Sequence, residues 1–415
     1  MEEIVVGIDV GTTKVCTLVG RVEDASALHI LGVGIEPSNG IKKGIIVDLE
    51  AASRAIVRSV ERAEQSSGIE IASALVSIAG AHVSSINSRG VVGISGEIVD
   101  EYDVLRVLEA ARSVAIPHSR EVIHIVQRGF SIDGQDGIRT PIGMHGYKLE
   151  VETHIITAST ATVDNLRQCL GAAGVEVQQF VLNPLASAEA VLTANERQMG
   201  AAVCDIGGGT TDMAIYVDGK VWHTMVLAVG GNHVTSDIAH GLRLSIAQAE
   251  DIKLQQGYAI RAEVGAEDYF NIRPFGEDND VQINKQELAH IIEARVEEIF
   301  ELSLQEIKRS GYDGLLPAGM VLTGGVSALP AIRDLASDVL RMPVRIAEPE
   351  NITGMVDQLH SPAYSTAVGL LRWALSSDEN EITPKRGRRS RKSKKGEKRG
   401  VKLSNAKDLF KRLLP

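Results

Sequence analysis

Three observations predict an α/β protein built from two related halves. The 415 residues include 40 glycines and are 44% apolar but only 4% aromatic, which is typical of aliphatic strands and helices joined by tight turns. Helical spacing of apolar residues alternates along the chain with short apolar runs that favour strands. A glycine-rich pattern also occurs twice, once in each half. Together these features predict duplicated halves around a cleft.

The repeated pattern occupies Ile4–Val19 and Ala201–Val217. Each copy is an apolar, β-branched run that ends in Asp9 or Asp205, followed by glycines and paired threonines and then by a second apolar run. Such a pattern predicts a β-hairpin whose turn needs glycine. We therefore expect each half to contribute one hairpin to the cleft.

Helical segments accompany the two hairpins and complete the α/β pattern. Apolar residues recur at helical spacing in Leu49–Gln65, Val104–Ala115, Val163–Ala173, Ser187–Ala194, Val234–His240, Ile246–Gln256 and Gln286–Lys308.

The alternation breaks between Ser84 and Thr162. This segment has a single helix, within Tyr102–Ala115, and three strand-like runs at Arg89–Ile94, Val122–Ile132 and Tyr147–Ile156. It predicts a small inserted α+β subdomain.

A third glycine-rich element, Met320–Ile332, combines an apolar strand, a Gly-Gly pair and a helix. Gly324 and Gly325 would let a flat ring approach the backbone closely. Taken alone, the same pattern also fits a simple strand-to-helix turn.

Cysteine usage and the chain start predict a cytoplasmic protein. Cys16, Cys169 and Cys204 lack metal-ligand spacing, so they are expected to be buried thiols in a reducing compartment. The acidic start, Met1-Glu2-Glu3, does not resemble an export signal. The longest charge-free stretches, residues 71–88 and 314–332, are too rich in polar residues, glycine or proline to predict a membrane-spanning helix.

Charge is distributed unevenly along the chain. Residues 385–415 carry 14 Lys or Arg against two acids, net +12, whereas residues 1–384 carry net −23. Such an asymmetry predicts an anionic partner, either nucleic acid or a membrane surface. Residues 376–402 lose their apolar side chains and predict a basic, disordered linker.

Residues 403–415 predict an amphipathic helix that lies on a membrane. Its twelve residues 403–414 span roughly 18 Å as a helix, well short of the ~30 Å hydrocarbon core, so the helix would bind the surface of anionic lipid rather than cross it. Packing against the body or a partner is the alternative. No aromatic residue interleaves the basic run, and the apolar helix beyond it favours lipid over nucleic acid. The apolar arc, about 140° wide, and its basic neighbours include Leu403, Leu409, Phe410, Leu413, Leu414, Lys407 and Lys411.

The two glycine turns predict a polyphosphate site. Backbone N–H groups and hydroxyls in a concave turn form a nest for anions, and two such turns can bind phosphates from opposite sides. Asp9 and Asp205, at the strand ends, would hold Mg²⁺ through its waters. The matched copies favour this site over two plain hairpins. A P-loop is excluded because the Gly219-Lys220 pair is followed by Val.

The order of motifs resembles the actin, Hsp70 and sugar-kinase superfamily of ATP-binding folds. Besides the hairpins, the motifs are PLASAEAV (Pro184–Val191), AEDIK (Ala249–Lys253), TGGVSALP (Thr323–Pro330) and YSTAVGLL (Tyr364–Leu371). Within that group the chain resembles the FtsA family of bacterial cell-division proteins. The supporting pieces are the insert ending PIGMHGYKLEVETHIITA, the segment AVGGNHVTSDIAHGL, and the basic linker with its terminal helix.

The resemblance implies an actin-like two-domain fold and a role for individual residues. Glu250 and Lys253 match the helix that touches ribose and base, although a helix-surface pair is the alternative, and Gly324 and Gly325 match the adenine-binding turn. Asp9 and Asp205 would lie near Mg²⁺. The residues that would hold the phosphates of ATP are Gly11, Thr12, Thr13 and Lys14 on one side and Gly207, Gly208, Gly209, Thr210 and Thr211 on the other.

One position departs from the hydrolytic relatives. Where the Hsp70 and MreB-like branches carry an acid immediately before the proline of the Pro-x-Ala-Ala helix, this chain has Asn183. An amide can position water but cannot accept its proton at neutral pH. The resemblance therefore predicts slow hydrolysis at best.

The resemblance also divides the chain into subdomains. Residues 1–83, completed by 163–197 and 346–375, would form the first actin-like subdomain, with 84–162 inserted. Residues 198–230, completed by 310–345, would form the core of the second half, and 231–309 its outer subdomain. Residues 376–402 would form the linker and 403–415 the membrane-targeting helix.

The expected function is that of an ATP-binding scaffold that polymerises on the cytoplasmic face of the inner membrane at the division septum. It would anchor FtsZ filaments by their carboxyl-terminal peptide and recruit later division proteins, with no nucleic acid. Arg295 and Lys285 are candidates for pairing with that acidic peptide. The rivals are a pilus-assembly scaffold of the PilM type and a small-molecule kinase of the same superfamily.

Overall fold

The computed structural model describes residues 3–24 and 27–380, in two compact units. Among these residues, unit 1 consists of 3–24, 27–84, 118–121 and 158–374, and unit 2 of 85–117, 122–157 and 375–380. The amphipathic helix predicted at 403–415 and residues 381–402 of the predicted linker lie outside the described residues.

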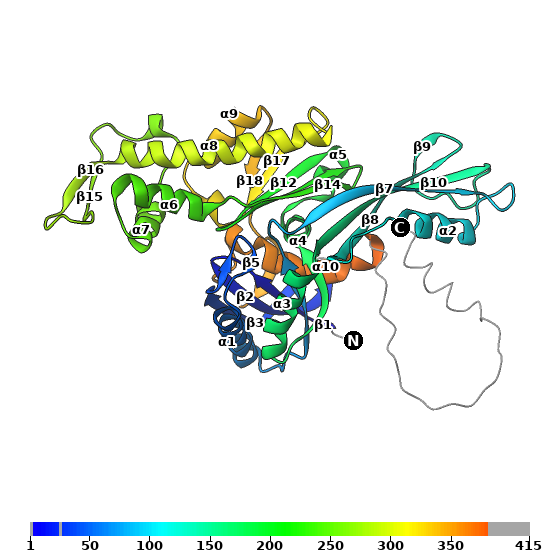
Figure 1. The fold of residues 1–415 in the computed structure, drawn as a ribbon, viewed down its shortest axis with the longest axis horizontal. Coiled ribbons are helices and arrows are strands. Elements are labelled where there is room, and N and C mark those ends of the chain that lie inside the picture. The colour runs from blue at the N-terminus through cyan, green and yellow to red at the C-terminus, as the bar shows by residue number, and fades with distance from the viewer. Residues whose placement is uncertain (1–2, 25–26, 381–415) are drawn as a thin grey trace. The chain divides into compact units, whose positions relative to one another are not determined.

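The first sheet of unit 1 has six strands in the order β11-β6-β1-β2-β3-β19 (Figure 1). β1, β2 and β3 pair antiparallel, so the first predicted hairpin is confirmed, while β6 runs parallel to β1 and β11 runs parallel to β6. The strand bounds are β1 (Glu3–Val10), β2 (Lys14–Asp24), β3 (Ala27–Pro37), β6 (Ser73–Ile78), β11 (Glu176–Leu182) and β19 (Ile352–Gly354).

The second sheet repeats this arrangement in the order β18-β17-β12-β13-β14. β12 and β13 form the second predicted hairpin, and β17 runs parallel to β12 as β6 does to β1. The duplication read from the sequence is thus confirmed as two sheets of matching topology. The bounds are β12 (Ala201–Ile206), β13 (Thr211–Val217), β14 (Lys220–Leu227), β17 (Met320–Thr323) and β18 (Val344–Ile346).

Two central helices, α4 (Asn183–Val191) and α10 (Ser365–Asn380), connect the halves of unit 1 (Figure 1). α4 packs against strands of both sheets, and Gly7 of β1 faces Leu370 of α10. On the first sheet, α1 (Leu49–Ser67) packs against β2 and β3, and α3 (Thr160–Ala172) packs against α1 and β11. Two short strands, β4 (Ile41–Lys42) and β5 (Ile45–Ile46), precede α1.

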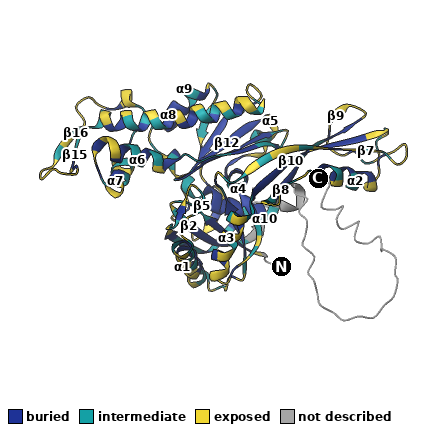
Figure 2. Ribbon diagram, viewed as in Figure 1, coloured by how far each residue is buried: buried dark blue, intermediate teal, exposed yellow. Residues whose placement is uncertain are grey.

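The remaining helices of unit 1 cover the second sheet with a continuous apolar core. Figure 2 shows the sheet strands as buried and the outward sides of α1, α7 and α8 as exposed. These elements are α6 (Gly231–Leu242), α7 (Ile246–Gln256), α8 (Lys285–Ser310), α9 (Ile332–Leu340), α5 (Ala194–Met199) and the hairpin of β15 (Tyr269–Ile272) and β16 (Val281–Asn284). Short 3₁₀ turns are η1 (Arg261–Glu263), η2 (Gly325–Ala328) and η3 (Pro362–Tyr364).

Unit 2 has the single helix and the three strands predicted for the insert, and a fourth, short strand, β9, that was not predicted. The order is β7-β10-β8-β9, and α2 packs its apolar side into a small core with the sheet. Asp100 caps α2 by accepting from the backbone of Asp103, and the Asp103 carboxylate accepts from the backbone of Asp100. The bounds are β7 (Ser84–Gly93), α2 (Glu101–Arg112), β8 (Arg120–Ile132), β9 (Gln135–Ile138) and β10 (Lys148–Ser159).

Three helices, α2, α4 and α10, differ in their ends from the sequence-based expectation. α2 ends at Arg112 rather than Ala115, with Ser113 as its C-cap. The helix expected at Ser187–Ala194 begins at Asn183, with proline in its first turn, and ends at Val191. α10 continues to Asn380, past the start of the predicted linker, because adding a turn to an existing helix is easy. The three cysteines are buried and free, as predicted.

Among the described residues, no helix combines the length and apolarity that crossing a bilayer requires.

Candidate functional site

A cavity of about 410 Å³ lies within unit 1, where the two hairpin turns, α7 and the turn after β17 meet. Most of the residues predicted from the sequence line it: Asp9, Gly11, Thr12, Thr13, Lys14, Asn183, Asp205, Gly207, Gly208, Gly209, Thr210, Glu250, Lys253 and Gly325. Sequence reasoning did not single out Asp212, Asn232, Val234, Leu254, Val326, Leu329 or Ala363, which also line it.

The two hairpin turns have the same local geometry and face each other. The Gly11 N–H donates to the Lys14 carbonyl at 3.0 Å, and the Gly207 N–H donates to the Thr210 carbonyl at 2.9 Å. A Cβ placed on Gly208 would lie 2.1 Å from the Thr13 hydroxyl. The turns therefore bring two glycine-rich, hydroxyl-bearing loops together, the arrangement that suits a polyphosphate.

Asp9 and Asp205 occupy matching positions at the ends of β1 and β12, and both are buried. The Ser77 hydroxyl donates to Asp9 at 2.8 Å, and the Ser187 hydroxyl donates to Asp205 at 2.5 Å. Burial raises the pKa of both carboxyl groups above the ordinary value, against the lowering effect of these hydrogen bonds and of the Lys14 charge. Each carboxylate is thus fixed in place but lacks full charge compensation.

A third aspartate, Asp212, joins them. It is the cross-strand partner of Asp205 in the second hairpin and is only 2% exposed. Thr210 donates to one of its oxygens at 2.7 Å, and the other, Oδ1, has no hydrogen-bond partner among the described residues. Burial and then the Asp205 charge raise its pKa well above the ordinary value. A charged residue at the start of an otherwise apolar strand was the available signal for this site.

The carboxylate set fits Mg²⁺ held through water. Hard cations prefer oxygen ligands, and an unpartnered buried carboxylate oxygen is stabilised by a nearby cation. No three His, Cys, Asp or Glu residues in the described part of the chain lie close enough to bind an ion directly. Since Mg²⁺ usually keeps several of its waters, a ring of carboxylates around a hydrated ion suits it better than a tight cage.

Asn183 opens α4 at the edge of the cavity. Its side-chain oxygen Oδ1 is buried and has no hydrogen-bond partner within the described residues. The amide can accept a hydrogen bond from a water there, but it cannot take up that water's proton at neutral pH.

The other end of the cavity is less polar. Lys253 pairs with Glu250 at 2.7 Å and donates to the Thr235 hydroxyl at 2.9 Å, so these two α7 residues belong to a local network facing the cavity. Apolar side chains complete this end: Val234, Leu254, Val326, Ala328, Leu329 and Pro330. A flat ring with a polar sugar fits this mixture.

Two of the predicted residues do not line the cavity. The Thr211 hydroxyl instead donates to the Val229 carbonyl at 2.9 Å. Gly324 lies behind the cavity wall with φ +86°, and a Cβ there would sit 2.4 Å from Asp205 Oδ1. Only glycine combines this left-handed backbone with such a close approach, so Gly324 acts by letting Asp205 and the turn pack together.

Comparison with known proteins identifies the family. The family model "Cell division protein FtsA" matches residues 202–369, and the model "SHS2 domain inserted in FTSA" matches residues 80–157. The chain is 40% identical over 381 residues to the cell division protein FtsA of Pseudomonas aeruginosa, covering 92% of this chain and 91% of that protein. It is 37% identical over 385 residues to FtsA of Escherichia coli, covering 91% and 92%.

Solved structures of similar fold support the architecture. A PilM–PilN type IV pilus biogenesis complex matches with a TM-score of 0.64 at 15% identity, covering 89% of this chain and 98% of that one. MreB5 of Spiroplasma citri bound to ADP matches with a TM-score of 0.56 at 16% identity, covering 89% and 96%. At such identities the likeness establishes the actin-like fold alone. The sequence relatives go further: this chain belongs to the FtsA family of cell division proteins.

Proposed function

We propose that this protein is an ATP-binding, actin-like scaffold that polymerises on the cytoplasmic face of the inner membrane and anchors FtsZ filaments there during cell division. One observation supports nucleotide binding: two matched glycine turns and three buried aspartates meet at one cavity. Membership of the FtsA family supports the proposed role in cell division. Recruitment of later division proteins would follow from the same position at the septum.

ATP would bind with its phosphates between the two turns and its adenosine against α7 and the turn at Gly325. Mg²⁺, when bound, would neutralise the phosphates, held through water by Asp9, Asp205 and Asp212. The ADP-bound state of the MreB5 relative supports a nucleotide in this fold. Nucleotide occupancy would act as a switch by favouring one arrangement of the two halves of unit 1 over another.

Calorimetry of Mg-ATP binding tests the site. Asp205→Ala should weaken binding at least tenfold, because it removes a fixed carboxylate from the cation and frees Ser187 from its acceptor. Asp251→Ala is the matched control, since Asp251 is an exposed carboxylate on α7 that does not line the cavity. Equal affinity in wild type and Asp205→Ala would contradict the proposal.

Hydrolysis should be slow because Asn183 stands where a general base would act. General-base catalysis is typically worth about 10²–10⁴-fold, so its absence leaves ATP mainly as a structural ligand. Steady-state phosphate release from the purified protein measures this. A turnover of several per second would mean that another group, with Asp212 the first candidate, accepts the proton.

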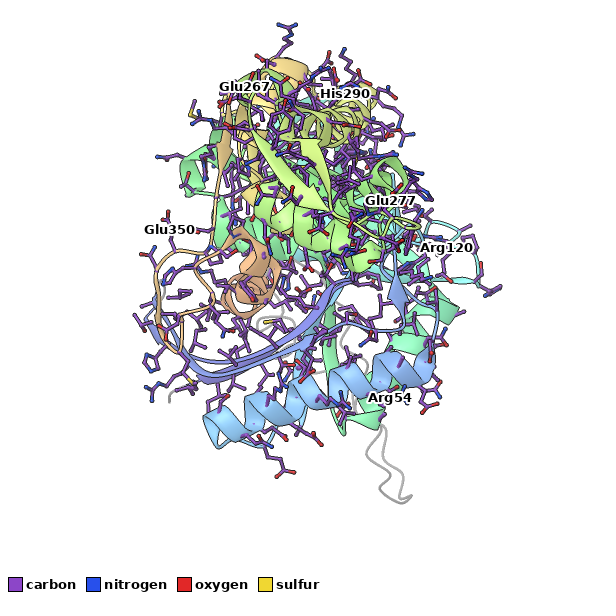
Figure 3. The ribbon with its side chains drawn as sticks, turned by 90° about the vertical axis from the view of Figure 1, so that its left-hand side faces the viewer. Arg54, Arg120, Glu267, Glu277, His290 and Glu350 are labelled. Carbon is purple, nitrogen blue, oxygen red and sulfur yellow. The ribbon has the colours of Figure 1, made fainter. Side chains whose placement is uncertain are left out.

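The FtsZ peptide would bind the outer subdomain formed by α6, α7, α8 and the β15–β16 hairpin. Figure 3 views this subdomain from the hairpin side, with Glu267, Glu277 and His290 among its surface side chains. Of the two expected anchors, Arg295 already makes a two-pronged ion pair with Asp237, at 2.5 and 3.1 Å. An acidic peptide would have to compete with Asp237 and Glu298 for this guanidinium.

Membrane attachment rests on the sequence of residues 403–415, which lie outside the described residues. The apolar positions Leu403, Leu409, Phe410, Leu413 and Leu414 and the cations Lys407 and Lys411 would provide the contact with anionic lipid. The PilM likeness is a likeness of fold alone, so it does not favour the pilus-scaffold alternative, and the kinase alternative is not part of the proposal.

A further inference from the structure

One short segment, Pro362–Thr366, contacts three of the elements that form the cavity of unit 1: the two hairpins and the Gly-Gly turn after β17. It comprises η3 and the first residues of α10, and we call it the helix-entry segment. The Pro362 carbonyl accepts from the Gly324 N–H at 3.1 Å, beside the Gly-Gly turn. Thr366 donates to Asp205 of the second hairpin at 2.9 Å. The third contact, to the first hairpin, is made through Lys14.

Lys14 reaches the helix-entry segment from the first residue of β2. Its ammonium donates to the Ala363 carbonyl at 2.6 Å and lies 4.6 Å from the centroid of the Tyr364 ring. Lys14 also lines the cavity, and its charge is close enough to act on the pKa of Asp9 and Asp205. An ammonium has three donors. The Ala363 carbonyl takes one of them, which leaves donors for an anion in the cavity.

Fixing this ammonium has a physical advantage. A free lysine side chain loses rotamer entropy when it binds an anion. A ring face attracts the cation without neutralising its charge, whereas a carboxylate partner would neutralise it. A lysine held by a ring and a carbonyl therefore keeps its full charge for the ligand and is already positioned.

We propose that Tyr364 is a positioning residue for the nucleotide: its ring holds the Lys14 ammonium at the wall of the cavity, ready to meet the phosphates. This inference rests on the proposed ATP site and adds to it a residue from the helix-entry segment. Tyr364 itself acts through Lys14. Its effect should therefore grow with the number of phosphates on the ligand and vanish for adenosine.

Calorimetry on the full chain with ATP, ADP and adenosine tests the proposal. Tyr364→Leu removes the ring face but keeps an apolar side chain, and should weaken ATP binding about three- to thirtyfold, the range for a partly desolvated cation–π contact. Binding of adenosine should change less than twofold. Tyr364→Phe retains the ring face and should return ATP affinity to within about twofold of wild type. Tyr269→Leu, at a 50% exposed tyrosine outside the cavity, is the matched control.

A double-mutant cycle separates positioning from general packing. In a Lys14→Met background, Tyr364→Leu should have no further effect on ATP binding, because the ring then has no cation to hold. The inference is overturned if Tyr364→Leu binds ATP like wild type, if it weakens adenosine as much as ATP, or if Tyr364→Phe is as weak as Tyr364→Leu. A wild-type protein that binds none of the three ligands would instead overturn the proposed ATP site.

Discussion

Three aspartates meet in the cavity of unit 1, and burial raises the pKa of each of them. Asp9 and Asp205 are compensated in part by hydroxyl donors and by Lys14. Asp212 has one oxygen without a partner and a neighbouring carboxylate across the hairpin. A buried charge in this state destabilises the ligand-free fold, and the same charge becomes favourable once a cation is present. Asp212 thus favours ligand binding over ligand-free stability.

Asp212→Asn should stabilise the ligand-free protein while weakening Mg-ATP binding. A carboxyl whose pKa is higher in the folded than in the unfolded state binds its proton more tightly when folded. Wild-type stability therefore falls as pH rises from the ordinary value of 3.8 through the raised pKa of Asp212. An asparagine at this position cannot ionise, so the Asp212→Asn variant does not lose stability in this way as pH rises. We expect a gain on the order of 1–3 kcal/mol at neutral pH, measured by thermal unfolding between pH 5 and 8.

The control for this prediction is Asp251→Asn, which changes an exposed carboxylate on α7. It should alter neither the stability nor its pH dependence beyond about 0.5 kcal/mol. A ligand-free Asp212→Asn protein that melts below wild type at neutral pH would show that the carboxylate is compensated by a donor of its own.

At the scale of elements, α4 extends from the cavity along the contact between the two sheets of unit 1. Its first residue, Asn183, lines the cavity. Three arginines meet its carboxyl end: Arg197 donates to the Ala188 carbonyl at 2.8 Å, Arg345 to the Val191 carbonyl at 2.7 Å, and Arg372 to the two carbonyls between them at 3.3 Å. Cations at this end satisfy the free carbonyls and the helix dipole. α4 is therefore anchored at the end away from the nucleotide.

α4 and α10 also cross at very close range. A Cβ placed on Gly369 of α10 would lie 1.9 Å from the Ala186 carbonyl of α4. Gly369→Ala should therefore push the two helices apart and destabilise the protein by about 1–3 kcal/mol, as overpacking typically does. Because Thr366 and Ser187 on these helices both hold Asp205, ATP binding should weaken as well. Thermal unfolding and calorimetry measure the two effects.

Gly171→Ala is the matched control on another helix. Gly171 lies in α3, and a Cβ there would meet no atom within 4 Å. The same substitution should stabilise by about 0.4–1 kcal/mol, because alanine loses less conformational freedom on folding. If both variants were stabilised equally, the crossing of α4 and α10 would not be as tight as described.

These contacts explain which parts of the molecule could be predicted from the sequence. The hairpins, most helices and the insert follow from apolar periodicity and glycine placement, which are local properties. Most of the phosphate-site residues lie in the two repeated turns, so the motif already groups them. The contact between Lys14 and Ala363 joins residues 349 positions apart, and no local pattern indicates it. Asp212 carried a signal, a carboxylate in an apolar strand, but its burial depends on the neighbouring elements.

At the scale of the whole molecule, the chain joins an acidic body to a basic terminal segment. Residues 1–384 carry net −23 and residues 385–415 net +12. An anionic membrane would repel the first and attract the second. This separation of charge favours the proposed attachment through the terminal segment, which would keep the acidic body away from the lipid.

Phe410→Glu should release the protein from anionic vesicles without affecting ATP binding. The large apolar residues of 403–414 could contribute about 1.5–3 kcal/mol each if fully buried. Ordering a helix costs about 1–2 kcal/mol per residue, so these terms nearly cancel. Each Lys or Arg near the surface adds about 1 kcal/mol. One chain should then bind weakly and a polymer strongly, since many segments act together. Sedimentation with liposomes, with and without ATP, measures the difference.

Ser404→Glu separates the two possible reasons for release. It introduces the same negative charge as Phe410→Glu, but on the polar side of the predicted helix, and it removes no apolar contact. Binding through apolar burial predicts that Ser404→Glu keeps most of its vesicle binding at low salt, whereas Phe410→Glu loses it. Equal loss in both variants would mean that charge alone attaches the segment. Equal pelleting of wild type and Phe410→Glu, or equal binding to neutral and anionic vesicles, would contradict attachment through this helix.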